Sequence, residues 1–192
     1  MAQFLTLTSP IAYLPIDDID TDQIIPASYL KITNKEGVAA GLFAGWRYHP
    51  DGTPKEDFVI NQAQNAQILV VGKNFGCGSS REHAAWALTG FGLKAVVALS
   101  FADIFYNNAL KNGLLPVKID ADTYQKIGRL YQVNPKTTIT IDLENQTLSL
   151  EDHHSIHFEI DPFSKTCLLK GVDELGYLLS LEDKIAAFES KL

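Results

Sequence analysis

The strongest constraint on the fold is a regular alternation of apolar runs and helical patterns between residues 66 and 119. Three short runs, AQILVVG, KAVVAL and LLPVKI, are apolar on both faces, which is typical of strands buried within a sheet. Segments with helical spacing separate the three runs. Because strands that alternate with helices pair in parallel, we expect an α/β centre over this region.

The residues after this centre carry a different pattern. The segment TTITIDLENQTLSLE alternates apolar and polar residues on either side of a turn at residues 144–146, which predicts a β-hairpin, and HSIHFEI alternates as well. The C-terminal residues have the apolar spacing of an amphipathic helix. We therefore expect one domain over residues 1–192, with antiparallel strands added to the parallel centre and a helical extension at about 171–192.

Charge and cysteine content exclude several classes of protein. The 192 residues carry a formal net charge of −7, which argues against a nucleic-acid binder. No apolar run approaches the roughly 20 residues of a membrane span, and the N-terminus lacks the pattern of a signal peptide. Cys77 and Cys167 predict free thiols in a reducing compartment, so we expect a cytoplasmic protein. Two cysteines are also too few for an iron–sulfur cluster.

The densest polar chemistry follows the first buried strand, in GKNFGCGSSREHA, residues 72–84. We expect a helix to begin near Ser79 or Ser80, so that its unpaired N–H groups and its dipole form an anion site. Arg81, in the first turn, adds a guanidinium fork suited to a carboxylate. Because the dipole disfavours a cation at this end of a helix, Arg81 indicates an anionic ligand.

Structural interpretations of the same residues stay open. Ser79 and Glu82 match the capping box S-x-x-E, and Ser80 is a second N-cap candidate. In the next helical segment, SFADIFYNNALKNG, Ser100 is the N-cap candidate and Gly113 the C-cap candidate. Glu82 and His83 are expected to be structural.

Two rival functions follow from the residues alone. Cys77, with His83 as its base, is a candidate nucleophile of a thiol hydrolase. A non-catalytic carboxylate-binding module is the second. The acidic stretch DDIDTD, which includes Asp22, predicts a solvated turn or a cation site, although it lacks the glycine and the terminal glutamate of a calcium loop.

Three segments resemble the signatures of one family. DIDTDQIIP, GCGSSREHA and SFADIFYNNALKNGLLPV follow one another, between residues 18 and 117, as they do in the swivelling domain of the aconitase superfamily. The chain length, the YLK after IIPAS and the loop WRYHPDGTPKEDFVIN are further similar to the small subunits of the bacterial isopropylmalate dehydratase family. The resemblance covers nearly the whole chain. It implies an α/β swivelling domain with β/β/α layers.

The resemblance also implies a chemistry. Enzymes of this family remove water from a hydroxy-dicarboxylate and add it back at the neighbouring carbon, which in the isopropylmalate branch is a step of leucine biosynthesis. By resemblance, Ser79 is the base, acting as an alkoxide, Ser80 and Arg81 bind the substrate, and Asp22 is an active-site carboxylate. A 4Fe–4S cluster on a separate large subunit is implied as the Lewis acid, with no metal on this chain. We therefore expect activity only in a heterodimer.

The segment YLKITNKEG indicates which substituent the substrate carries. Aconitases that accept citrate have an arginine shortly after the equivalent of YLK, whereas here none precedes Arg47. We therefore expect a substrate with an apolar substituent, walled by Tyr29 and Leu30, although Lys31 could still reach a carboxylate. The closely related small subunits of homoaconitase and of the citraconate or 2,3-dimethylmalate dehydratases stay as alternatives.

Overall fold

The computed structural model describes residues 2–31, 35–63, 65–152 and 154–190. Within these residues one seven-stranded sheet has the strand order β4-β3-β2-β1-β5-β6-β7. The strands are β1 (Thr6–Leu14), β2 (Ile68–Val71), β3 (Ala95–Ala98), β4 (Leu115–Lys118), β5 (Thr138–Asp142), β6 (Thr147–Leu150) and β7 (Ser155–His157).

The sheet has a parallel half and an antiparallel half that share β1. The C-terminal half of β1 pairs in parallel with β2, with Ile11 opposite Ile68, and β2, β3 and β4 continue the parallel pairing. The N-terminal half of β1 pairs antiparallel with β5, with Thr6 opposite Asp142. The hairpin of β5 and β6 and the added strand β7 complete the sheet. The predicted parallel centre and the predicted antiparallel strands are both confirmed.

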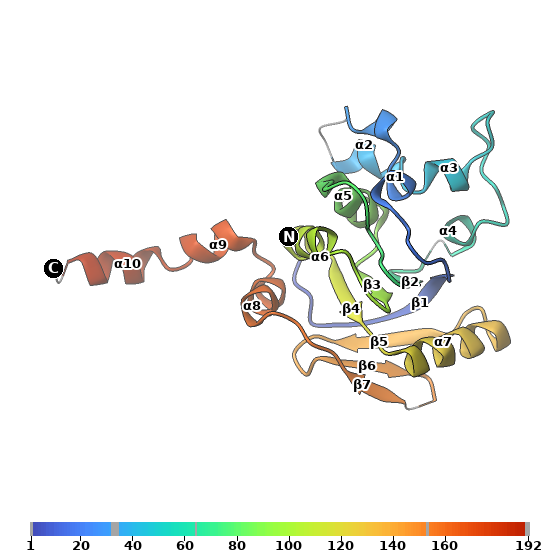
Figure 1. The fold of residues 1–192 in the computed structure, drawn as a ribbon. Coiled ribbons are helices and arrows are strands. Elements are labelled where there is room, and N and C mark those ends of the chain that lie inside the picture. Colours follow the sequence, from blue (N-terminus) through green and yellow to red (C-terminus); the bar gives the residue numbers. More distant parts are fainter. Residues whose placement is uncertain (1, 32–34, 64, 153, 191–192) are drawn as a thin grey trace.

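Helices cover one face of the parallel half (Figure 1). Alternate residues of β2 divide between two clusters of buried side chains: Leu69 and Val71 pack with α5 (Glu82–Phe91), whereas Ile68 and Val70 pack with residues of the antiparallel strands. The helix α6 (Asp103–Lys111) contributes to both clusters, through Phe105 to the first and Leu110 to the second. This division explains why β2 is apolar along its whole length.

Two helices after β4 were not predicted from the sequence, α7 (Ala121–Val133) and α8 (Pro162–Lys170). The apolar side of α7 is built partly from tyrosines, since Tyr124 and Tyr131 pack against Tyr13, and Asp120 caps its first turn. The start and stop signals of α8 were present in the sequence. Asp161 caps its first turn, and the chain leaves it at Gly171, which has a φ of 70°.

The region before β2 forms several short helices. They are α1 (Thr21–Ile24), the 3-10 helix η1 (Ala27–Tyr29), α2 (Lys35–Ala39), α3 (Ala44–Arg47) and α4 (Val59–Gln62). α2 and α3 are separate helices, because Phe43 adopts a left-handed backbone, with a φ of 49°, between them. The predicted loop at residues 47–61 ends in α4.

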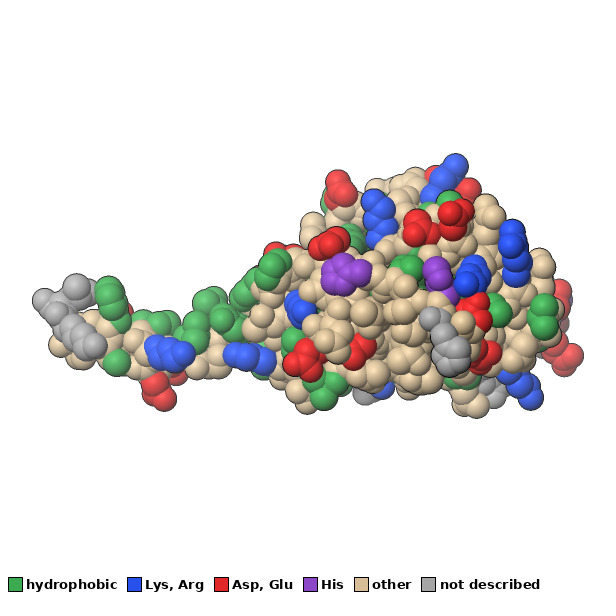
Figure 2. Space-filling model, turned by 90° about the horizontal axis from the view of Figure 1, so that it is seen from below, with side chains coloured by type: hydrophobic (Ala, Val, Ile, Leu, Met, Phe, Trp, Pro, Cys, Tyr) green, Lys and Arg blue, Asp and Glu red, His purple; other side chains and the backbone are tan. Residues whose placement is uncertain are grey.

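The C-terminal residues form two helices, α9 (Glu174–Leu179) and α10 (Glu182–Glu189), which extend away from the sheet (Figure 1). Apolar side chains lie exposed along this arm in Figure 2, at Leu175, Leu178, Leu179, Ile185 and Phe188. The helical pattern predicted for these residues is confirmed. None of the described helices is long and apolar enough to cross a membrane.

Gly76 is expected to be irreplaceable for two reasons. Its φ of +76° is left-handed, and a Cβ atom there would lie 2.2 Å from Cγ of Phe105. We expect Gly76→Ala to lower the free energy of unfolding by about 1–2 kcal/mol for the backbone and about 1–3 kcal/mol more for overpacking, measured by urea denaturation.

Gly52 supplies a matched control for this substitution. Its φ is +84°, but nothing lies within 4 Å of the Cβ position, so Gly52→Ala should lose only the backbone contribution. Equal losses in the two variants would show that the contact with Phe105 carries no energy.

Candidate functional site

Three loops meet at the edge of the sheet where β1, β2 and β3 end, because parallel strands place their carboxyl ends together. The loop after β1 is joined to the loop after β2 by backbone hydrogen bonds. In order along the chain, these run from Gly72 N–H to the Ile16 carbonyl (3.1 Å), from Asp18 N–H to Lys73 (2.9 Å), from Gly76 N–H to Ile19 (2.8 Å) and from Thr21 N–H to Cys77 (3.0 Å). We call these bonds the loop ladder.

The loop after β3 joins from the other side. Phe75 donates to the Ser100 carbonyl (3.1 Å) and accepts from Ala102 N–H (3.0 Å), and the Ser100 hydroxyl accepts from Asn74 N–H (2.8 Å). The prediction that Ser100 caps the next helix is wrong, because α6 begins at Asp103 with Ala102 at its N-cap position. Ser100 fixes the loop after β2 instead.

The helix after the glycine-rich loop begins later than predicted. α5 starts at Glu82, and Arg81 occupies its N-cap position without a side-chain cap. The capping box of Ser79 and Glu82 is therefore not formed, and Ser80 is not a cap. Both serines are exposed in the loop before the helix. Glu82 has a structural partner instead, since it accepts a hydrogen bond from the Asn112 side chain (2.9 Å).

Arg81 pairs with Asp22, through Nη1 and Oδ1, and this ion pair joins two of the sequence motifs. The Arg81 side chain is 19% exposed and that of Asp22 is 55% exposed. An arginine at this end of a helix is thus balanced by a carboxylate of the chain itself, which the sequence argument for an external anion did not anticipate. The structure brings Ser79, Ser80, Arg81 and Asp22 to one edge of the sheet.

The other acids of DDIDTD are engaged by protein donors. Asp20 caps α1 through Gln23, Asp18 accepts from the Asn74 amide (2.8 Å), and Asp17 accepts from Lys73 N–H (2.9 Å). Among the described residues, no three His, Cys, Asp or Glu side chains are placed to hold a metal ion. The acidic stretch therefore serves to join the loops, and the cation-site interpretation loses its support.

Thr21 was not singled out from the sequence. Its side chain is 2% exposed, and its hydroxyl donates to the Ser79 carbonyl (2.9 Å). Only its place between Asp20 and Asp22 could have drawn attention to it.

Cys77 is in a poor setting for a nucleophile. Its Sγ lies 3.4 Å from the Asp18 carbonyl oxygen, and burial, with the negative charges of Asp20 and Asp18, raises the pKa of the thiol. The thiolate is the reactive form, so a raised pKa lowers reactivity at neutral pH. The His83 ring packs on Trp86, with centroids 4.7 Å apart. The thiol-hydrolase alternative therefore lacks an activated thiol.

The predicted substrate-selecting residues follow α1. Tyr29 and Leu30 are half-buried and Lys31 is exposed. The Tyr29 ring lies against Gly41, where a Cβ atom would be 2.6 Å from its Cγ. Tyr29 is therefore anchored in the core at one side of the site. Residues 32–34 of the same segment lie outside the described residues.

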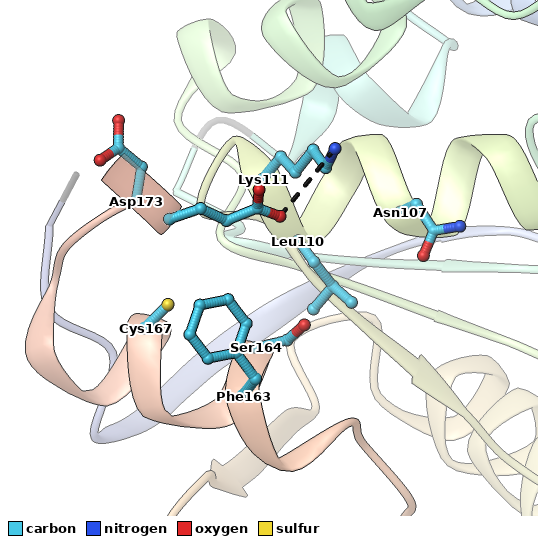
Figure 3. A pocket seen from close by; sticks show the side chains of 8 residues that line it. Asn107, Leu110, Lys111, Phe163, Ser164, Cys167 and Asp173 are labelled. Atoms are coloured by element: carbon cyan, nitrogen blue, oxygen red, sulfur yellow. Dashed lines mark ion pairs between the residues drawn. The ribbon is translucent and has the colours of Figure 1, made fainter. Parts of the chain in front are cut away.

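A pocket on another part of the molecule carries the second cysteine (Figure 3). It lies between α6 and α8, and Leu110, Phe163 and Cys167 form its apolar side, while Lys111 and Glu174 pair across its rim at 3.9 Å. Burial raises the pKa of the Cys167 thiol. None of the predicted site residues lines this pocket, so it is separate from the edge that carries Ser79 and Arg81.

Comparison with known proteins agrees with this geometry. Residues 1–122 match the family described as the aconitase C-terminal domain, and residues 129–162 match the family LeuD_N. A 3-isopropylmalate dehydratase small subunit from Roseiflexus sp. is 57% identical over 192 residues, covering 99% of this chain and 94% of the relative. One from Cytophaga hutchinsonii is 50% identical, covering 98% and 95%.

A solved structure supports the same assignment. The crystal structure of 3-isopropylmalate dehydratase from Methanocaldococcus jannaschii superposes with a TM-score of 0.69 at 30% identity, covering 97% of this chain and 99% of that one. The fold is thus the swivelling domain of the aconitase superfamily, as predicted. Within that superfamily, the chain belongs to the family of 3-isopropylmalate dehydratase small subunits.

The raised pKa of Cys77 predicts how its reactivity depends on pH. In a Cys167→Ser background, alkylation by iodoacetamide should be slower at neutral pH than for a cysteine in an unstructured peptide. The rate should reach its half-maximum at a higher pH than the peptide does, because the thiol stays protonated further into the alkaline range. Faster alkylation than the peptide at neutral pH would contradict the assignment of Cys77 as a structural thiol.

Proposed function

We propose that this chain is the small subunit of a two-subunit hydro-lyase that isomerises 2-isopropylmalate to 3-isopropylmalate in leucine biosynthesis. The observation that carries the proposal is the meeting of Ser79, Ser80 and Arg81 with Asp22 at the carboxyl edge of a sheet with the fold of this family. The names of the curated relatives support the substrate and the presence of a large subunit.

Each residue receives a role from its position. Ser79 is exposed and makes no helix cap, so its hydroxyl is available to take a proton from the carbon next to a substrate carboxylate. Arg81 binds that carboxylate together with Ser80. Its ion pair with Asp22 uses one of its two terminal nitrogens, and a guanidinium has five N–H donors, so donors remain for the substrate. Asp22 orients the guanidinium.

Ser79 needs more than its place near a helix to act as a base. A helix N-terminus contributes about 0.3–1 kcal/mol, and up to about 2 when partly buried, which corresponds to roughly one pKa unit. That is too little to make a serine hydroxyl basic at neutral pH. Exclusion of water and further fixed hydrogen-bond donors must supply the rest. Ser79 is exposed on this chain, so the large subunit is the part of the complex that would cover it.

The 4Fe–4S cluster of the family is assigned to the large subunit. The residues of this chain do not fit it, because Cys77 lies in the loop after β2 and Cys167 lies on α8, beside a different pocket. No step that needs the cluster is therefore given to this chain. We further propose that residues 1–192 form one swivelling domain with a helical extension at about 171–192, and that the protein acts in the cytoplasm.

Reconstitution with the large subunit tests the proposal. We expect no turnover of 2-isopropylmalate by the isolated chain, and turnover once a cluster-loaded large subunit is added under anaerobic conditions. In the complex, Ser79→Ala should lower kcat by about 10²–10⁴-fold with little change in KM, because a base acts in the transition state.

Ser80→Ala is the matched control, since Ser80 is the adjacent exposed serine and also caps no helix. It should raise KM more than it lowers kcat. Turnover by the isolated chain would refute the two-subunit proposal, and full activity of Ser79→Ala would refute the role of Ser79.

The absence of an arginine after YLK predicts the substrate preference. Ile32→Arg or Thr33→Arg should raise kcat/KM for analogues with an additional carboxylate and lower it for 2-isopropylmalate. Loss of fit to an apolar group costs about 1–3 kcal/mol, whereas an unpaired buried charge is penalised more. Measuring both substrates with each variant gives the ratio. An unchanged ratio in both variants would remove the support for isopropylmalate over homoaconitase- or citraconate-type substrates.

A further inference from the structure

We propose that Thr21 is the positioning residue that sets the place of the Ser79 hydroxyl. This inference rests on the proposed function, in which Ser79 is the catalytic base. Thr21 itself is 2% exposed, so it is enclosed by protein and does not reach the substrate. It acts only through the backbone of Ser79.

Thr21 donates two hydrogen bonds to the loop after β2, to the carbonyls of Cys77 and Ser79. The Thr21 hydroxyl donates to the Ser79 carbonyl (2.9 Å), and its backbone N–H donates to the Cys77 carbonyl (3.0 Å). Gly78, between these two acceptors, has a φ of +86°, a left-handed conformation that favours glycine, although a Cβ atom there would make only ordinary van der Waals contacts with Asp20 and Thr21. The hydroxyl bond extends the contact between the two loops beyond the last bond of the loop ladder, to Ser79.

The backbone of the loop is intrinsically free at this point. Gly76 and Gly78 both have left-handed φ values, of 76° and 86°, and glycine is the residue with most backbone freedom. Ser79 precedes the first residue of α5 by three positions and is not held by a helix cap. Without the Thr21 hydroxyl, the Ser79 carbonyl would lose its side-chain bond to the neighbouring loop.

The three residues of the D-T-D motif therefore have separate tasks. Asp20 accepts from Gln23 N–H at 2.8 Å and so fixes the start of α1. Asp22, in the first turn of that helix, holds Arg81. Thr21, between them, holds Ser79, so one rigid segment orients both the base and the carboxylate-binding residue.

The test uses the complex with the cluster-loaded large subunit. Thr21→Val keeps the β-branched shape and removes the hydroxyl. We expect kcat for 2-isopropylmalate to fall by about 10²-fold, the order of loss that a displacement of about 1 Å causes, while KM stays within about threefold. Thr21→Ser, which restores the donor, should recover most of kcat. Where valine does not fit, Thr21→Ala carries the same expectation.

Thr137→Val is the matched control. Thr137 is also 2% exposed, and its hydroxyl donates to Glu151 (3.1 Å) at the start of β5, away from the site. It should lose stability to a similar degree and keep its kcat. If both variants lose stability alike and neither loses kcat, Thr21 is only structural and the inference is wrong.

A double variant separates this inference from the proposed function. If Thr21 acts only through Ser79, adding Thr21→Val to Ser79→Ala should leave the residual rate unchanged within about twofold. A further large loss would show that Thr21 acts elsewhere. If Ser79→Ala is inactive but Thr21→Val keeps full kcat, only the positioning role fails. If Ser79→Ala is fully active, the proposed role of Ser79 fails first.

Discussion

The site depends on the loop ladder, in which the parallel pairing of β1 and β2 continues past the ends of both strands. Two loops that would each be irregular alone acquire a common register through four backbone hydrogen bonds. Every predicted catalytic or carboxylate-binding side chain projects from one of these loops or from the helix that follows it. Because the bonds are between backbone groups, the arrangement depends on chain path more than on side-chain packing, and glycines are required where the loops approach most closely.

The ion pair of Arg81 and Asp22 joins the same two segments as the loop ladder, through charge rather than backbone hydrogen bonds. A guanidinium beside a helix N-terminus is unfavourable, and a carboxylate from the first turn of α1 compensates for it. The same carboxylate holds the guanidinium at the edge of the sheet. Under the proposed function, a substrate carboxylate would meet an arginine that is already oriented, so less side-chain entropy would be lost on binding.

The sequence alone predicted the parallel centre, the hairpin and the helical C-terminus, because each has a local periodicity. The family resemblance predicted that D-T-D and S-S-R belong to one site, and the Arg81–Asp22 pair joins those motifs in the structure. What could not be predicted depends on contacts between distant segments. Ser100 has the local features of a cap, but its hydroxyl is used by Asn74, and α5 begins at Glu82 because residues 76–79 are held by the loop after β1. α7 was also missed, although its amphipathic pattern and the Asp120 cap of its first turn are local signals.

The position of β1 between the two halves of the sheet also bears on how the chain folds. Its C-terminal half pairs with β2, which begins at residue 68. Its N-terminal half pairs with β5, and there the Thr8 hydroxyl bonds to that of Thr140, 132 residues further along the chain. β1 can therefore complete its pairing only after residues 138–142 have been synthesised. Such distant pairing slows folding, since the entropy of closing a long loop is lost before the contact forms. During synthesis, β1 can pair with β2 while its other half stays an open edge that must avoid pairing with other chains.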